Sequence, residues 1–90
     1  MLKVTKFGGS SMADAGQYRK VRDIVLADPS RRVVIVSAAG KSADENHKIT
    51  DLLYLCHAHI RYGMDCTHVF DMIKNRYLQV RDELGLDIAL

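Results

Sequence analysis

The 90-residue sequence has no tryptophan, one proline and only two cysteines, and it contains no long apolar run. A membrane-spanning helix needs about 20 apolar residues, so we expect no membrane partner. The opening MLKVTKF lacks the apolar core and the small-residue cleavage site of a secretory signal peptide. These absences favour a cytoplasmic protein whose cysteines stay reduced, without a disulfide.

A large excess of charge of one sign is also missing, since the net charge is +2. Nucleic-acid-binding domains usually carry a dense basic patch, whereas the lysines and arginines here are spread among acidic residues. We therefore expect no nucleic-acid partner. With 48% hydrophobic and 27% charged residues, the chain has the composition of a globular protein, and its length suits one small domain.

The first 40 residues predict a strand, a helix and a second strand. Residues 2–7 alternate as a strand does, and residues 32–37 contain a continuous β-branched run typical of a buried parallel strand. Between them, Pro29 ends a helix whose apolar residues recur at helical spacing: Tyr18, Val21, Ile24 and Val25. Such a unit places the carboxyl ends of both strands at one edge of the sheet, where ligands bind.

The remaining residues predict two helices after a polar loop at 41–48. The first helix ends at Gly63. Its apolar residues are Ile49, Leu52, Leu53, Cys56 and Ile60. Asp65 is placed to cap the second helix, which ends at Gly85. A narrow apolar seam follows that helix and must pack against a partner. The seam consists of Cys66, Phe70, Ile73, Tyr77, Val80 and Leu84.

Histidines and cysteines gather in these helices without forming a metal-binding pattern. The residues concerned are Cys56, His57, His59, Cys66 and His68. Cys56 and His59 can share a helix face, but no CxxC or HxxxH pair supplies the usual chelating unit for zinc. We expect no metal site here. We interpret Cys56 and Cys66 as small hydrophobic residues on apolar helix faces.

The most informative segment is KFGGSS, at residues 6–11, where the first strand ends. Glycines let the backbone approach a ligand closely, and the free N–H groups and positive dipole end of a following helix attract an anion. Lys6 would add a full positive charge. The segment lacks the lysine of a P-loop and the third glycine of a dinucleotide fingerprint, so spacing alone predicts only an anion site.

Three segments in the same order closely resemble the N-terminus of the aspartokinases: KFGGSS, VVIVSAAGKS and NHKITDLLY. The resemblance covers most of residues 2–55 and weakens to a generic helical pattern beyond them. It implies an α/β protein with the three-layer αβα amino acid kinase-like fold. Residues 1–90 would be an N-terminal β-α-β-α-α portion of a single kinase domain with parallel strands, and the regulatory ACT domains would be absent.

The resemblance also implies a reaction. Aspartokinases transfer the γ-phosphoryl group of ATP to the side-chain carboxylate of L-aspartate, giving 4-phospho-L-aspartate for lysine, threonine and methionine biosynthesis. Mg²⁺ would be bound through the nucleotide. By resemblance, Lys6 would contact the ATP phosphates and stabilise charge during transfer, while Gly8, Gly9 and Ser10 would cradle the same oxygens. The alternative for Lys6 is an exposed lysine that ends an edge strand beside an ordinary turn.

By resemblance, Ser37 and Thr50 would hold the aspartate substrate. A serine at a strand end is otherwise a cap or a turn former, and a threonine at a helix start otherwise bonds the free N–H groups there. The loop at 41–48 resembles the longer form found in some aspartokinases. It could close over substrate or be an ordinary solvated loop, and we assign no catalytic role to its Asp44, Glu45 or His47.

Two alternatives stay open at this point. Related kinases of the superfamily phosphorylate glutamate, carbamate or a nucleotide. A rival of another class is a non-catalytic fragment that self-associates through its exposed helix seam. That seam would present Phe70, Ile73, Tyr77 and Leu84. We expect the 90 residues to be inactive alone, because the second half of the nucleotide site is missing, and we expect the enzyme to be a homo-oligomer.

Overall fold

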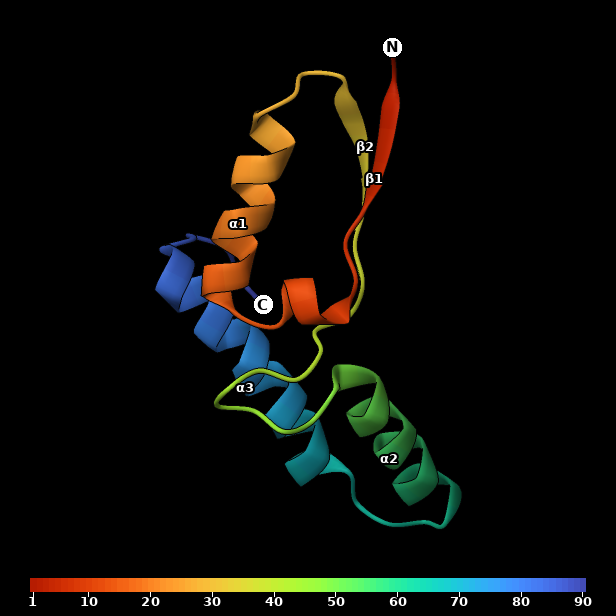
Figure 1. The fold of residues 1–90 in the computed structure, drawn as a ribbon. Helices are drawn as coiled ribbons and strands as arrows, with labels where there is room; N and C mark the ends of the chain where they lie inside the picture. The colour runs from red at the N-terminus through yellow and green to blue at the C-terminus, as the bar shows by residue number, and fades with distance from the viewer.

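A computed structural model describes all of residues 1–90 as two strands and three α-helices, with one short 3₁₀ turn (Figure 1). The elements in chain order are β1 (Lys3–Lys6), η1 (Gly9–Met12), α1 (Ala15–Leu26), β2 (Arg31–Ile35), α2 (Ile49–Arg61) and α3 (Thr67–Leu84). The expected β-α-β-α-α order is confirmed. The molecule is elongated, measuring 51 × 26 × 25 Å, with the strands at one end and α2 at the other.

The two strands pair in parallel, as predicted, and Lys6 lies opposite Ile35. The N–H of Phe7 donates to the carbonyl of Ile35 at 2.9 Å, which carries the pairing one residue beyond β1. The expectation that β2 is buried is wrong within this chain. Val34 is 37% exposed and Val36 is 54% exposed. Among the helices, only α1 contacts β2, so most of the sheet surface is uncovered (Figure 1).

Helices α2 and α3 form a helical hairpin with a common core (Figure 1). That core consists of Ala39, Ile49, Leu52, Cys56, Val69 and Ile73. The predicted seam of α3 is confirmed at Ile73 and Val80, which are buried. It is wrong at Phe70, which is 54% exposed because the neighbouring Val69 points into the core instead. The seam therefore packs largely within the chain.

Both helix ends that the glycines predict are present. Gly63 has φ 71° and Gly85 has φ 68°, the left-handed conformation in which glycine often ends a helix. At the start of α3, the N–H and hydroxyl of Thr67 donate to the Asp65 carboxylate at 3.0 and 2.6 Å. These hydrogen bonds hold the pKa of Asp65 below its ordinary value. Asp65 therefore bonds the first residue of α3 as expected of a cap, but the N-cap position itself is Cys66, whose side chain makes no capping hydrogen bond.

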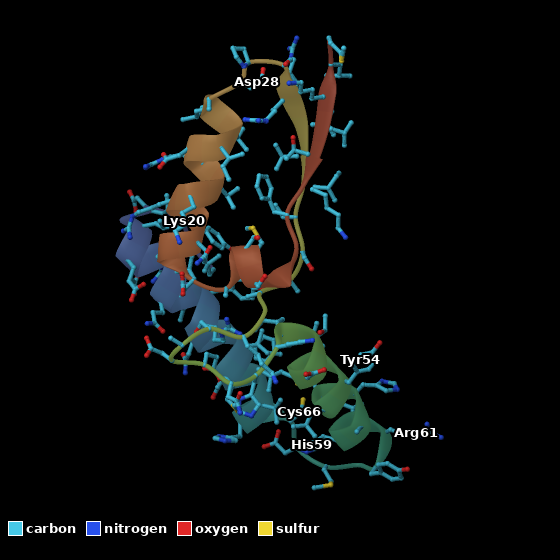
Figure 2. The ribbon with its side chains drawn as sticks, viewed as in Figure 1. Lys20, Asp28, Tyr54, His59, Arg61 and Cys66 are labelled. Atoms are coloured by element: carbon cyan, nitrogen blue, oxygen red, sulfur yellow. The ribbon has the colours of Figure 1, made fainter.

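Cys56 and Cys66 are free thiols at the α2–α3 core, where Figure 2 labels Cys66 beside His59. Burial raises the pKa of the Cys56 thiol, and the neighbouring Cys66 raises it further. A thiol in such surroundings stays protonated and behaves as a small hydrophobic side chain. No group of three histidine, cysteine, aspartate or glutamate side chains is arranged to hold a metal ion.

None of the helices has both the length and the apolar character needed to cross a bilayer.

Asp28 ties the turn after α1 to the first strand (Figure 2). Its carboxylate accepts hydrogen bonds from the Lys3 ammonium at 2.5 Å, the Ser30 hydroxyl at 2.5 Å and the Ser30 N–H at 3.0 Å. The hydrogen bond from Lys3 is the largest cause that holds the pKa of Asp28 far below its ordinary value, followed by those from Ser30.

This low pKa predicts an acid-dependent stability. A carboxylate whose pKa is depressed by folding stabilises the fold above its unfolded pKa of about 3.9, and the contribution is lost as the pH falls from there through the folded value. We expect Asp28→Asn to lower the thermal midpoint at neutral pH and to lower it progressively less below the unfolded pKa. Circular dichroism melts across this range measure the difference. Asp87→Asn, in the exposed tail, is the control, and a constant effect of Asp28→Asn at every pH would contradict the prediction.

Candidate functional site

The loops that follow the two strands touch each other at one edge of the sheet. The N–H of Gly40 donates to the carbonyl of Gly9 at 2.8 Å. A side-chain carbon at Gly40 would lie 2.8 Å from the carbonyl carbon of Gly9 and 3.0 Å from the nitrogen of Ser10. Only a glycine allows this approach without displacing backbone. The contact joins the segments KFGGSS and VSAAGKS directly.

A pocket of about 450 Å³ opens where these loops meet the start of α2. Four of the six predicted site residues line it: Gly9, Ser10, Ser37 and Thr50. The remaining two, Lys6 and Gly8, do not line the pocket and are exposed on the segment that leads from β1 to it. The structure therefore brings the predicted substrate residues Ser37 and Thr50 together, and it leaves the predicted phosphate-binding residue Lys6 outside the pocket wall.

Three consecutive backbone donors are unpaired in the turn after β1. The N–H groups of Gly8, Gly9 and Ser10 form no hydrogen bond within the chain. No atom lies within 4 Å of the position where Gly8 would carry a side-chain carbon. The turn is thus open on that side, and successive free N–H groups form the kind of backbone surface that binds anions.

The expected helix dipole is not available to this turn. The glycines lead into η1, a 3₁₀ turn of four residues, and α1 begins only at Ala15. The N-cap of α1 is Asp14, whose carboxylate accepts the N–H of Gln17 at 2.9 Å. This acidic side chain already occupies the positive end of the helix. Any anion at the turn would depend on Lys6 and the free N–H groups.

Both helices of the hairpin hold the second loop. The N–H of Ala39 donates to the Tyr77 hydroxyl at 3.2 Å, and the carbonyl of Ala39 accepts the N–H of Ile49 at 2.9 Å. Ala39 is 4% exposed, so both polar groups of a buried residue are satisfied. Because Ser37 precedes Ala39 and Thr50 follows Ile49, these bonds set where the two hydroxyl-bearing residues lie relative to each other.

Arg76 of α3 is the buried cation of the structure, 8% exposed. Its guanidinium donates to the carbonyls of Ala13, Gly40 and His47, each at 2.8 Å. These carbonyls belong to the end of η1, the loop after β2 and the segment before α2. A planar fork of donors can reach several acceptors at once, which a lysine cannot do equally well. One side chain therefore ties the three connections around the site.

Tyr18 of α1 lies close to the same group. Burial raises the pKa of the Tyr18 hydroxyl, Tyr77 raises it further, and Arg76 opposes both. The hydroxyl is therefore neutral at physiological pH.

Motif spacing did not single out Arg76, Lys41 or Lys48. The only sign of Arg76 in the sequence is its spacing, since it falls on the helix face that carries Ile73 and Val80. Lys41 and Lys48 bound the polar loop, and both line the pocket. Neither forms an ion pair within the chain, and no carboxylate lines this pocket. The pocket wall therefore carries unneutralised positive charge.

The sequence profile described as "Amino acid kinase family" matches residues 1–81. The chain belongs to the amino acid kinase family. Among curated relatives, it is 41% identical over 85 residues to aspartokinase 3 of Bacillus subtilis (strain 168), which is 94% of this chain. It is 29% identical over 88 residues to the chloroplastic aspartokinase 2 of Arabidopsis thaliana, which is 97% of this chain. These relatives confirm the resemblance to the aspartokinases.

A solved structure agrees with the fold. The chain is 48% identical to an aspartate kinase from Clostridium acetobutylicum, with a TM-score of 0.90 over 96% of this chain. The expected fold class is confirmed, because the parallel strands and helices match part of an aspartate kinase fold. The chain spans 20% of that kinase, 19% of aspartokinase 3 of Bacillus subtilis and 16% of aspartokinase 2 of Arabidopsis thaliana.

The role of Arg76 predicts a large effect of a conservative substitution. Arg76→Lys should leave at least one buried carbonyl unpaired and should lower the free energy of unfolding by about 2 kcal/mol. Urea denaturation measures this loss. Arg22→Lys is the control, since Arg22 pairs at the surface with Asp23 and should change stability by less than about 0.5 kcal/mol. Equal losses of stability from the two substitutions would show that the three hydrogen bonds of Arg76 do not hold these connections together.

The contact between the two loops predicts a difference between two glycines. Gly40→Ala should lower the free energy of unfolding by about 1 to 3 kcal/mol, because the added carbon meets backbone. Gly8→Ala should be nearly neutral, because the position is open and its φ of −77° suits alanine. Urea denaturation of both variants compares them. The loops do not pack as described if Gly40→Ala is tolerated as well as Gly8→Ala.

Proposed function

We propose that residues 1–90 are a portion of the kinase domain of an aspartate kinase, which transfers the γ-phosphoryl group of ATP to the side-chain carboxylate of L-aspartate. The observation that carries the proposal is the meeting of two loops at Gly9 and Gly40, which gathers Ser10, Ser37 and Thr50 around one pocket. The likeness to aspartokinases along most of the chain supports the choice of aspartate as acceptor.

The chemistry suits the groups present. The acceptor carboxylate is already ionised at neutral pH, since its ordinary pKa is about 3.9, and so it needs no general base. The obstacle is repulsion between this carboxylate and the phosphates, together with the need for in-line alignment. Fixed positive charge and free N–H donors reduce the repulsion. The turn at Gly8 to Ser10 supplies such donors, and Lys6 supplies charge.

The proposed roles follow this division. Lys6 contacts the phosphates and stabilises the charge that develops during transfer, and the N–H groups of Gly8, Gly9 and Ser10 hold the phosphate oxygens. The hydroxyls of Ser37 and Thr50 orient aspartate in the pocket. The pocket and the turn contain no carboxylate that could hold Mg²⁺. The ion would therefore come bound to the nucleotide, where it would neutralise phosphate charge.

A chimera tests the proposal, because the chain spans only part of its relatives. The matched 85 residues of Bacillus subtilis aspartokinase 3 are replaced by those of this chain, and aspartate-dependent ADP release is measured. We expect an active enzyme. Lys6→Ala should lower kcat by about a hundredfold, whereas Ser37→Ala and Thr50→Ala should raise the KM for aspartate and leave that for ATP unchanged.

Lys20→Ala is the control for charge, since Lys20 is an exposed lysine on α1 (Figure 2). It should leave both kinetic constants unchanged. A well-folded chimera with no aspartate-dependent turnover would overturn the proposed acceptor. Full activity of the Lys6→Ala chimera would overturn the role of that lysine alone.

A further inference from the structure

The loop at residues 41–48 is anchored at both ends and turns tightly between them. Gly40, just before it, is bonded to Gly9 and to Arg76, and the carbonyl of His47 accepts a second donor of the same guanidinium. At the tip, the N–H of Ser42 donates to the carbonyl of Glu45 at 2.9 Å. The loop is thus held at both ends, and its two end residues, Lys41 and Lys48, line the site pocket.

The charged side chains of this loop separate onto two sides. Lys41 and Lys48 line the pocket that contains Ser37 and Thr50, and no acidic residue joins them there. Asp44 and Glu45 line a different pocket, of about 300 Å³. Asp14 and Glu83 line that second pocket as well. Positive charge is therefore concentrated on the side of the loop that faces the predicted substrate residues.

Lys48 also breaks a local rule of helix structure. It is the N-cap residue of α2, a position usually taken by serine, threonine, aspartate or asparagine, and its side chain makes no capping hydrogen bond. A cation near the positive end of a helix is electrostatically unfavourable. Asp51 lies in the same turn but does not line the pocket. Such a departure from the rule is typical of a residue kept for binding.

We propose that Lys41 and Lys48 are substrate-binding residues that select an acceptor with two carboxylates over its neutral amide. The inference rests on the proposed function and extends it, because it assigns to this loop the preference for a charged acceptor over a neutral one. The hydroxyls of Ser37 and Thr50 orient the acceptor, and the two ammonium groups supply the opposite charge. Neither ammonium has a competing carboxylate within the pocket.

Binding to the chimera tests this assignment without requiring turnover. Calorimetry without nucleotide gives the dissociation constant of L-aspartate for the parent chimera, Lys41→Gln, Lys48→Gln and the double variant. We expect each single substitution to weaken aspartate binding about tenfold, the typical effect of losing a charge-assisted hydrogen bond. L-Asparagine should bind weakly to all forms. Thermal melts confirm that these exposed substitutions leave the fold intact.

The matched control is Lys20→Gln, which removes the same charge from α1, away from the start of α2 (Figure 2). It should leave aspartate binding unchanged. High salt should weaken aspartate binding to the parent and affect the double variant less, because ions screen exposed charges.

Three results would overturn the inference. The first is unchanged aspartate affinity in both lysine variants, and the second is no binding of aspartate by the parent chimera. The third is a higher KM for ATP with unchanged aspartate affinity, which would assign the lysines to phosphate. Failure of the proposed function is distinguishable, because a chimera that binds aspartate through these lysines yet transfers no phosphoryl group supports this inference and refutes the kinase activity.

Discussion

The arrangement of the site depends on one buried guanidinium. Burying an arginine without a carboxylate partner is costly unless its donors are satisfied, and Arg76 meets this condition with the carbonyls of Ala13, Gly40 and His47. Those carbonyls lie in three separate connections of the chain. The three hydrogen bonds offset the cost of burying the charge. Because one side chain makes all of them, they also fix the three connections relative to one another. Tyr77, the next residue, fixes the same loop through Ala39.

Much of this molecule could be predicted from its sequence, for clear physical reasons. Hydrophobic periodicity, Pro29 and the helix-ending glycines located both strands and the three α-helices but not the 3₁₀ turn η1, because these signals act locally. Parallel strands leave their carboxyl ends at one edge, and this rule accounts for the meeting of Ser10 and Ser37 at the pocket, whereas Thr50 was predicted by resemblance alone. The exposure of β2 could not be predicted, because burial depends on which elements cover the sheet.

The site residues that escaped prediction have long-range causes. Arg76 donates to backbone carbonyls, which every residue possesses. The residue types in the sequence therefore give no sign of its partners. Lys41 and Lys48 belong to a polar stretch whose composition is typical of an ordinary surface loop. Only the path of the backbone shows that both line the pocket. The helix expected directly after the glycines begins later, at Ala15, because Asp14 caps it there.

The position of Arg76 also has a consequence for the order in which the site is assembled during synthesis. All the predicted site residues precede α3 in the chain, whereas two of the groups that hold the second loop in place, Arg76 and Tyr77, lie within that helix. A nascent chain that has emerged only as far as α2 contains every pocket hydroxyl but lacks these two anchors. The second loop therefore gains its full set of hydrogen bonds only when α3 docks against it.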